Sequence, residues 1–213
     1  MTTLVVTAVA TEAAAVATGG RAVRLGPYEG LRKNGITAVP GGVGPAQAAA
    51  CAGTLLALHR YDLVVSAGIG AAYGRRAAVG DLVLADRVVH ADLGADSPEG
   101  FLPIDALGLG AATTWLDEAL VARVAARTPV AAGPIVTVST VTGTAERAKE
   151  LVAAYDPAAE GMEGAGVLAA ARAHGLPFLE LRGISNLVGR RDRSAWDLPA
   201  ALAALTRIPA ALA

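Results

Sequence analysis

Lysine and cysteine, two residues on which common functional classes depend, are scarce in this sequence. Its 213 residues include two lysines, Lys33 and Lys149, and the formal net charge is -1. Binding to a nucleic-acid backbone or to an anionic membrane needs clustered cations. The one local cluster of arginines, in residues 190–193, is interrupted by Asp192 and is typical of a solvated loop. The sequence therefore predicts neither a nucleic-acid-binding nor a membrane-bound protein.

Cysteine and histidine are too few or too scattered for disulfide or metal chemistry. Cys51 is the single cysteine, so it cannot form an intrachain disulfide, and its Ala-rich helical context predicts a buried thiol. His59, His90 and His174 lack metal-ligand spacing, so we expect no metal and no other cofactor. Residues 1–10 lack the basic segment of an export signal, and no uninterrupted apolar run reaches the roughly 18 residues of a membrane span. We expect a cytoplasmic protein.

Apolar runs rich in β-branched residues alternate with helical patterns along the chain. This alternation predicts one domain over residues 1–213, in three α/β/α layers with a central mixed sheet. The predicted strands are 4–9, two or three short ones within 21–39, 63–66, 81–90, 135–139, one ending at 161–163 and one ending at 182–186. The predicted helices are 13–16, 46–58, 112–127, 145–154, one between 163 and 178, and 198–212, which Pro209 shortens, while 91–110 is predicted to be a loop. Asn34-Gly35 is typical of a hairpin turn, and Thr144 is typical of a helix N-cap.

Polar or glycine-rich segments follow four of the predicted strands. Glu12 follows the first strand, a glycine-rich turn at residues 68–71 follows the third long one, and Glu163 and Asn186 follow the last two. Ligands bind at the carboxyl ends of strands in open α/β sheets, so we expect these groups to form one site. Glu12 has a second interpretation, as an acid that complements the dipole of the helix that follows it.

These motifs occur in an order that resembles the nucleoside phosphorylase and methylthioadenosine nucleosidase superfamily over nearly the whole chain. The matching segments are Ala8–Glu12, Gly41–Gly44, Gly68–Gly70, Met162-Glu163 and Arg182–Asn186. The resemblance implies a nucleoside phosphorylase-like fold, cleavage of the N-glycosidic bond of a small-molecule nucleoside, and a homodimer or higher homo-oligomer.

The resemblance also implies roles for individual residues. Glu12 would activate the attacking water, Glu163 would bind the ribose hydroxyls, Met162 would pack against the sugar, and Arg182 would support the site. Asn186 would face the departing base. The other substrate-binding residues expected on this basis are Val43, Ile69, Gly70, Thr142, Gly143 and Thr144.

Two departures from the superfamily pattern narrow the expected chemistry. Phosphorylases carry an arginine where this chain has residues 66–69, Ser-Ala-Gly-Ile; without that cation a phosphate dianion is costly to bind, which favours water as the nucleophile. Adenine-specific nucleosidases carry Asp where this chain has Asn186. A carboxamide is not an acid, but its NH₂ group donates to O6 or N7 of a 6-oxopurine, so we expect hypoxanthine as the base.

Longer stretches resemble the futalosine hydrolases within this superfamily. They are residues 137–144, 160–164, 177–186 and 188–193, with Trp196 beyond them. This resemblance implies release of hypoxanthine from futalosine in menaquinone biosynthesis. Two alternatives stay open: another purine nucleosidase or phosphorylase acting on inosine, methylthioinosine or methylthioadenosine, and a nucleoside-binding protein without turnover. Glu12 weighs against the last, because binding alone does not need a carboxylate that activates water.

Overall fold

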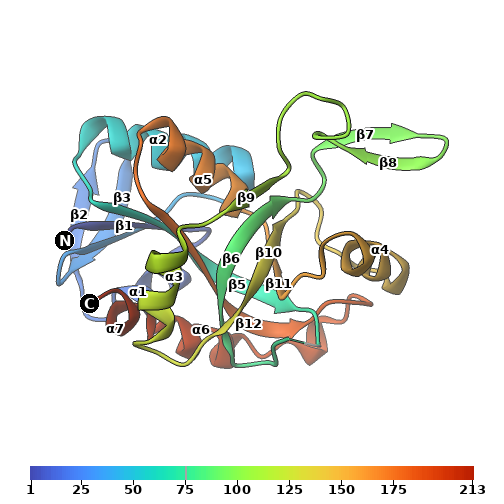
Figure 1. Cartoon of the computed structure of the whole chain (residues 1–213). Helices are drawn as coiled ribbons and strands as arrows, with labels where there is room; N and C mark the ends of the chain where they lie inside the picture. The colour runs from blue at the N-terminus through green and yellow to red at the C-terminus, as the bar shows by residue number, and fades with distance from the viewer. Residues whose placement is uncertain (75) are drawn as a thin grey trace.

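A mixed β-sheet forms the middle of the molecule in the computed structural model, which describes residues 1–74 and 76–213 (Figure 1). The strands are β1 (Thr3–Thr7), β2 (Arg21–Leu25), β3 (Tyr28–Lys33), β4 (Ile36–Pro40), β5 (Leu63–Ala72), β6 (Leu82–His90), β7 (Gly94–Ser97), β8 (Gly100–Pro103), β9 (Thr113–Trp115), β10 (Ala131–Thr137), β11 (Ala159–Gly161) and β12 (Phe178–Leu187). Their order in the main sheet is β11-β10-β6-β12-β5-β1-β4-β3-β2, and β9 pairs with β6. β4, β1, β5 and β12 pair in parallel, whereas β12 and β6 are antiparallel.

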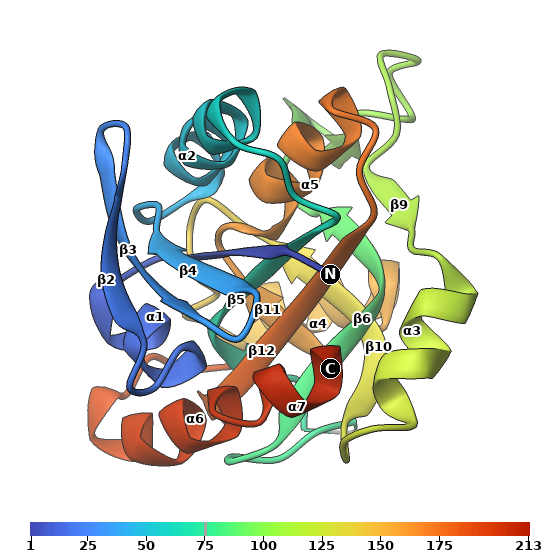
Figure 2. The same ribbon diagram turned by 90° about the vertical axis from the view of Figure 1, so that its left-hand side faces the viewer.

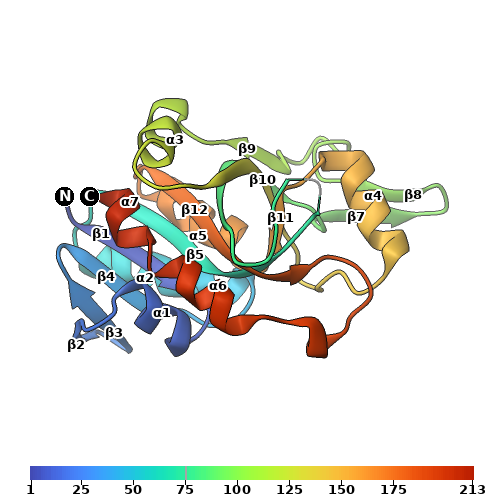
Figure 3. The ribbon, with the colours of Figure 1, turned by 90° about the horizontal axis from the view of Figure 1, so that it is seen from below.

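Helices cover both faces of this sheet (Figures 1 and 3). They are α1 (Ala10–Val16), α2 (Pro45–Leu58), α3 (Glu118–Ala125), α4 (Ala145–Tyr155), α5 (Gly164–Ala173), α6 (Leu198–Leu205) and α7 (Ile208–Leu212), with a 3-10 turn at Arg193–Ala195. α2 and α5 pack on one face, and α1, α3, α6 and α7 pack on the other. The predicted α/β/α layering around a mixed sheet is confirmed.

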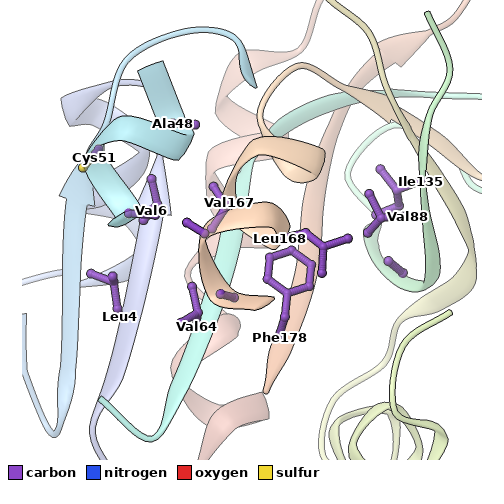
Figure 4. Close-up of a cluster of buried hydrophobic side chains, with 14 of the residues drawn as sticks. Leu4, Val6, Ala48, Cys51, Val64, Val88, Ile135, Val167, Leu168 and Phe178 are labelled. Carbon is purple, nitrogen blue, oxygen red and sulfur yellow. The ribbon is translucent and has the colours of Figure 1, made fainter. Parts of the chain in front are cut away.

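The hydrophobic core lies between α2, α5 and the sheet, as Figure 4 shows. Val6 of β1, Val64 of β5 and Val167 of α5 are among its fully buried side chains, and Phe178 closes it at the start of β12. Each such side chain contributes about 1.5–3 kcal/mol when it leaves water. The thiol of Cys51 lies in the same cluster, as predicted, and burial raises its pKa to about 12. The core therefore holds the strands at whose ends the polar residues stand.

β11 is three residues long but pairs on both of its sides. Ala159 lies opposite Ile135 of β10 in parallel register and opposite Ala72 of β5 in antiparallel register. Because β10, β6, β12 and β5 are successive neighbours, the second pairing closes these strands into a ring. The ring fixes the position of the residues that follow β11 relative to the ends of β5 and β12.

Turn and capping residues account for two of the correctly predicted boundaries. Asn34 and Gly35 adopt φ of 48° and 80° between β3 and β4, the conformation that a tight hairpin needs. Thr144 caps α4, because its hydroxyl accepts a hydrogen bond from the N–H of Arg147.

Three predicted elements differ in the structure. The predicted loop 91–110 contains the hairpin of β7 and β8, which projects from the body in Figure 1. The predicted helix 112–127 is replaced by β9 and the shorter α3. Thr113 and Thr114 pair with β6, and α3 begins only after Asp117, whose side chain accepts a hydrogen bond from the N–H of Leu120. The predicted helix 198–212 is two helices, with Pro209 in the first turn of α7, where its missing N–H costs little.

None of the helices in the described residues is long and apolar enough to cross a bilayer.

α2 and α5 lie side by side, as Figures 1 and 2 both show, and Gly166 is at their contact. A methyl group at Gly166 would overlap the carbonyl group of Pro45, so Gly166→Ala forces the two helices apart. We expect a loss of about 1–3 kcal/mol in the free energy of unfolding. Urea denaturation measures this loss.

Gly53→Ala is the matched control, because a methyl group there meets no atom within 4 Å. In α2 this change is expected to stabilise the protein by about 0.4–1 kcal/mol. Equal effects of the two substitutions would contradict the role of Gly166 in helix packing.

Candidate functional site

Glu12 is in the first turn of α1, immediately beyond the end of β1, and its carboxylate is held by three backbone N–H groups. The N–H of Ile69 donates to Oε1 at 2.8 Å, and those of Ala8 and Val9 donate to Oε2 at 2.8 and 3.0 Å. The side chain is 4% exposed. Burial raises the pKa of Glu12, although the hydrogen bonds from Ile69 and Val9 oppose this rise. Glu12 therefore serves as a helix-capping acid and is also a fixed, buried carboxylate beyond the end of β1.

The guanidinium of Arg182 is fully buried and bonded on all sides. Nε donates to Oε1 of Glu180 at 2.9 Å, Nη1 donates to Oε2 of Glu163 at 2.9 Å, and Nη2 donates to Oγ of Ser66 at 3.0 Å. Two carboxylates thus share one cation, between the middle of β5, the middle of β12 and the residues that follow β11. A buried arginine is tolerated in such a place because its charge and its donors are satisfied.

Glycines around Arg182 leave the room that this buried charge needs. A Cβ at Gly68 would lie 2.9 Å from both Nη1 of Arg182 and Oε1 of Glu12, and one at Gly161 would lie 2.7 Å from Cζ of Arg182. The glycine-rich turn predicted at 68–71 is therefore wrong, because β5 continues unbroken through Ala72. These glycines make space for side chains from other elements, and they show that Glu12 and Arg182 meet beside Gly68.

Glu163 connects this cluster to the glycine loop before α2. Its Oε1 accepts a hydrogen bond from the N–H of Gly44 at 3.2 Å, while Oε2 faces Arg182 and the N–H of Met162. Met162 is half-buried, and Val43 is 52% exposed beside Gly44. Val43 and Met162 thus lie next to the backbone groups that bind Glu163, in positions open to a ligand.

Asn186 faces a second region, a cavity of about 330 Å³ at the far end of β12. The hydroxyl of Ser185 donates to Oδ1 of Asn186 at 2.7 Å, which fixes the plane of the carboxamide. Thr142, Arg190 and Arg191 also line the cavity; the other lining residues are Ala71, Val79, Val141, Leu187, Gly189, Asp192, Ala195 and Trp196. The arginine cluster predicted to be a solvated loop is exposed, yet it forms one wall of this cavity.

The predicted segment 142–144 divides between this cavity and α4. Thr142 is buried and lines the cavity, whereas the exposed Thr144 uses its hydroxyl to cap α4. The carbonyl of Gly143 accepts a hydrogen bond from the N–H of Arg191 at 3.3 Å. Among the described lining residues, Thr142 is thus the member of this segment best placed to meet a ligand.

β5 and β12 join the two regions. Ile69 lies opposite Gly183, Gly70 opposite Ile184, and Ala71 opposite Asn186, with an irregularity between Ile184 and Asn186. The same pair of strands therefore carries Ile69, which binds Glu12, and, a few residues later, Ala71 and Asn186, which line the cavity.

Three buried polar residues of the site were not singled out in the sequence. Glu180 and Ser66 bind Arg182, and Glu160 binds Thr142. A signal for Glu180 existed, because Glu180 and Arg182 are two residues apart in an apolar strand and therefore point to the same face. In the part of the chain that the structure describes, no cluster of three or more His, Cys, Asp or Glu side chains could hold a metal ion.

Comparison with known proteins places this geometry in context. The family model described as "Phosphorylase superfamily" matches residues 3–212. A futalosine hydrolase of Acidothermus cellulolyticus is 45% identical over an alignment of 219 positions, which covers 98% of this chain and 89% of that protein. A futalosine hydrolase of Streptomyces coelicolor is 52% identical over 171 residues, which cover 78% of this chain and 73% of that protein.

Solved structures share the fold at lower identity. The futalosine hydrolase of Helicobacter pylori has a TM-score of 0.82 and 19% identity, covering 100% of this chain and 97% of that one. The 5'-methylthioadenosine/S-adenosylhomocysteine nucleosidase of the same organism has a TM-score of 0.83 at 19% identity, with the same coverage of both chains.

Glu180 makes stability depend on pH. Burial raises the pKa of Glu180 to about 7 in the folded protein, from an ordinary value of 4.5, against the opposing effect of Arg182. The folded state therefore holds more protons than the unfolded state between these values, so stability falls as pH rises from 4.5 to 7. Glu180→Gln keeps an acceptor for Arg182 but does not titrate, and we expect a weaker fall. Thermal unfolding at a series of pH values measures it.

Glu29→Gln, an exposed carboxylate on β3, is the control and should leave the pH dependence of stability unchanged. Identical pH profiles for wild type and Glu180→Gln would show that Glu180 does not titrate in this range.

Proposed function

Because the chain belongs to the phosphorylase superfamily, we propose that it hydrolyses the N-glycosidic bond of futalosine and releases hypoxanthine and dehypoxanthine futalosine. The observation that carries this proposal is the similarity to futalosine hydrolases over most of the chain. The site supports it with a buried base at Glu12, a Glu163–Arg182 pair beside it, and a cavity that contains Asn186.

Glu12 is suited to activate water. Its carboxylate is held by three backbone N–H groups, and burial raises its pKa, which brings its basicity closer to neutral pH. In the proposed reaction, the oxygen of water bonds to C1′ of the ribose while the bond from C1′ to the purine breaks. The electron pair leaves with the base, which takes a proton from solvent to become neutral hypoxanthine, and Glu12 accepts one proton of the attacking water. Glu163 binds the ribose hydroxyls, and Arg182 holds its carboxylate in place.

The cavity near Asn186 suits a 6-oxopurine. Hypoxanthine presents O6 and N7 as acceptors, and the NH₂ group of Asn186 is a donor. Arg190 and Arg191 line the same cavity, so further cationic donors are available at the base end. These donors meet the negative charge that develops on the departing base without a full proton transfer.

The biological setting forms part of the same proposal. Its support is the resemblance to the futalosine hydrolases, which implies a step in menaquinone biosynthesis; we propose that this step takes place in the cytoplasm. The exposed Leu102 and Leu109, on and near the projecting β7–β8 hairpin, are available for contact with a second copy of the chain. We accordingly propose a homodimer or a higher homo-oligomer.

Base release from separate nucleosides tests the proposed function. The purified protein is incubated with futalosine, inosine or methylthioadenosine, with and without phosphate, and the bases are separated by chromatography. We expect hypoxanthine from futalosine in phosphate-free buffer. Adenine from methylthioadenosine would contradict the role of Asn186, and release only after addition of phosphate would identify a phosphorylase. Binding of futalosine without release under any condition would identify a nucleoside-binding protein.

Glu12→Gln separates turnover from binding. We expect kcat to fall by about 10²- to 10⁴-fold, because a carboxamide cannot take the proton of water. Calorimetric titration should show that hypoxanthine still binds. Glu118→Gln, which removes the first-turn acid of α3, is the matched control and should leave kcat unchanged. Full activity of Glu12→Gln would show that Glu12 does not accept the proton of water and that its role is to cap α1.

A further inference from the structure

We propose that Glu160 is a positioning residue that holds both loops of the Asn186 cavity in place and so sets the affinity for the purine. The two loops are residues 139–144, between β10 and α4, and residues 188–196, after β12. Glu160 does not line the cavity described above, and its part in the reaction is indirect. The consequence for purine affinity rests on the proposed function, whereas the fastening of the loops does not.

Three donors converge on the carboxylate of Glu160. Oε1 accepts the backbone N–H of Thr142 at 2.9 Å, and Oε2 accepts the hydroxyl groups of Thr142 and of Tyr73, the latter at 3.1 Å. Glu160 is 3% exposed and Tyr73 is 6% exposed. A buried carboxylate that accepts several hydrogen bonds holds its donors more strongly than a neutral acceptor does.

The backbone of Glu160 is as firmly held as its side chain. In β11 it lies opposite Val136 of β10 on one side and opposite Ala71 of β5 on the other. Its carbonyl oxygen would lie 2.7 Å from a Cβ at Gly70, so β5 and β11 are in close contact. Glu160 therefore connects Thr142 to a strand that is paired on both of its sides.

The second loop depends on the first. The N–H of Arg191 donates to the carbonyl of Gly143, the residue after Thr142. Arg191 and Arg193 in turn stack on the ring of Trp196. The Cζ atom of Arg191 lies 5.4 Å from the ring centroid, and that of Arg193 lies 5.8 Å from it. Displacement of Thr142 thus moves the acceptor of Arg191 and, through it, the wall that Arg191 and Trp196 form. Thr142 and, through Gly143, Arg191 are thus linked to the sheet through one carboxylate, while Val188 at the start of the second loop bonds directly to Ala72 of β5.

Amide hydrogen exchange of Glu160→Gln tests the fastening without any substrate. One carboxamide oxygen cannot accept from three donors, so the amide of Thr142 should exchange faster. The informative amide is that of Arg191, which does not touch Glu160: its exchange should also accelerate, while amides in β1 and α2 keep their protection. Unchanged protection at Arg191, or faster exchange throughout the chain with a lower Tm, would overturn the proposal.

Kinetics with futalosine tests the consequence for the substrate. We expect kcat/KM of Glu160→Gln to fall by roughly 10- to 100-fold, the range for a lost hydrogen bond to a charged group. The fall should lie mainly in KM, because the catalytic carboxylates are not altered. Calorimetric titration with hypoxanthine should show a matching loss of affinity. A fall confined to kcat would overturn the assignment to purine affinity.

Two variants serve as controls. Tyr73→Phe removes one donor but leaves both bonds to Thr142, so its effect on KM should be smaller than that of Glu160→Gln. Glu150→Gln makes the same chemical change on the exposed side of α4, where Glu150 pairs with Arg147, and should change neither exchange nor KM. A wild-type protein that does not act on futalosine would refute the proposed function, and hydrogen exchange at Arg191 would still decide on the fastening.

Discussion

The site depends on one buried cation. Arg182 carries its charge into the core of the protein, and Glu163, Glu180 and Ser66 surround it there. Removing either partner from a buried ion pair typically costs about 3–5 kcal/mol, because the other charge is left unpaired. Each of the four residues is therefore constrained by the others, and the orientation of the Glu163 carboxylate follows from the position of Arg182.

Sequence patterns predicted what depends on neighbouring residues. Apolar β-branched runs placed the strands, Asn34-Gly35 placed a hairpin, and Thr144 placed the start of α4. Interactions between distant residues were harder to infer. Gly68 and Gly70 suggested a turn, since glycine is common in turns, whereas their absent side chains make room for Arg182, which is far along the chain.

The same limit applies to the candidate site. Apolar runs placed Glu12, Glu163, Arg182 and Asn186 at strand ends. The structure places Glu12 and Glu163 just beyond β1 and β11 and Asn186 near the end of β12, whereas Arg182 lies in the middle of β12. No sequence pattern showed that Glu160 is bonded to Thr142. That bond depends on the packing of β11, which no short motif specifies. The roles of these residues in catalysis stay predictions until the variants are measured.

The double pairing of β11 has a consequence for how the protein folds. A strand of three residues has little stability alone, and here both of its partners, β5 and β10, are distant in sequence or separated from it by α4. The entropy of closing such loops must be offset before the strand gains its hydrogen bonds. We therefore expect β11 to join late, once β5 and β10 are in place. Because Glu163 lies two residues after β11, a chain that has collapsed but not closed this ring lacks the Glu163–Arg182 pair, so completion of folding and formation of the candidate site would be the same event.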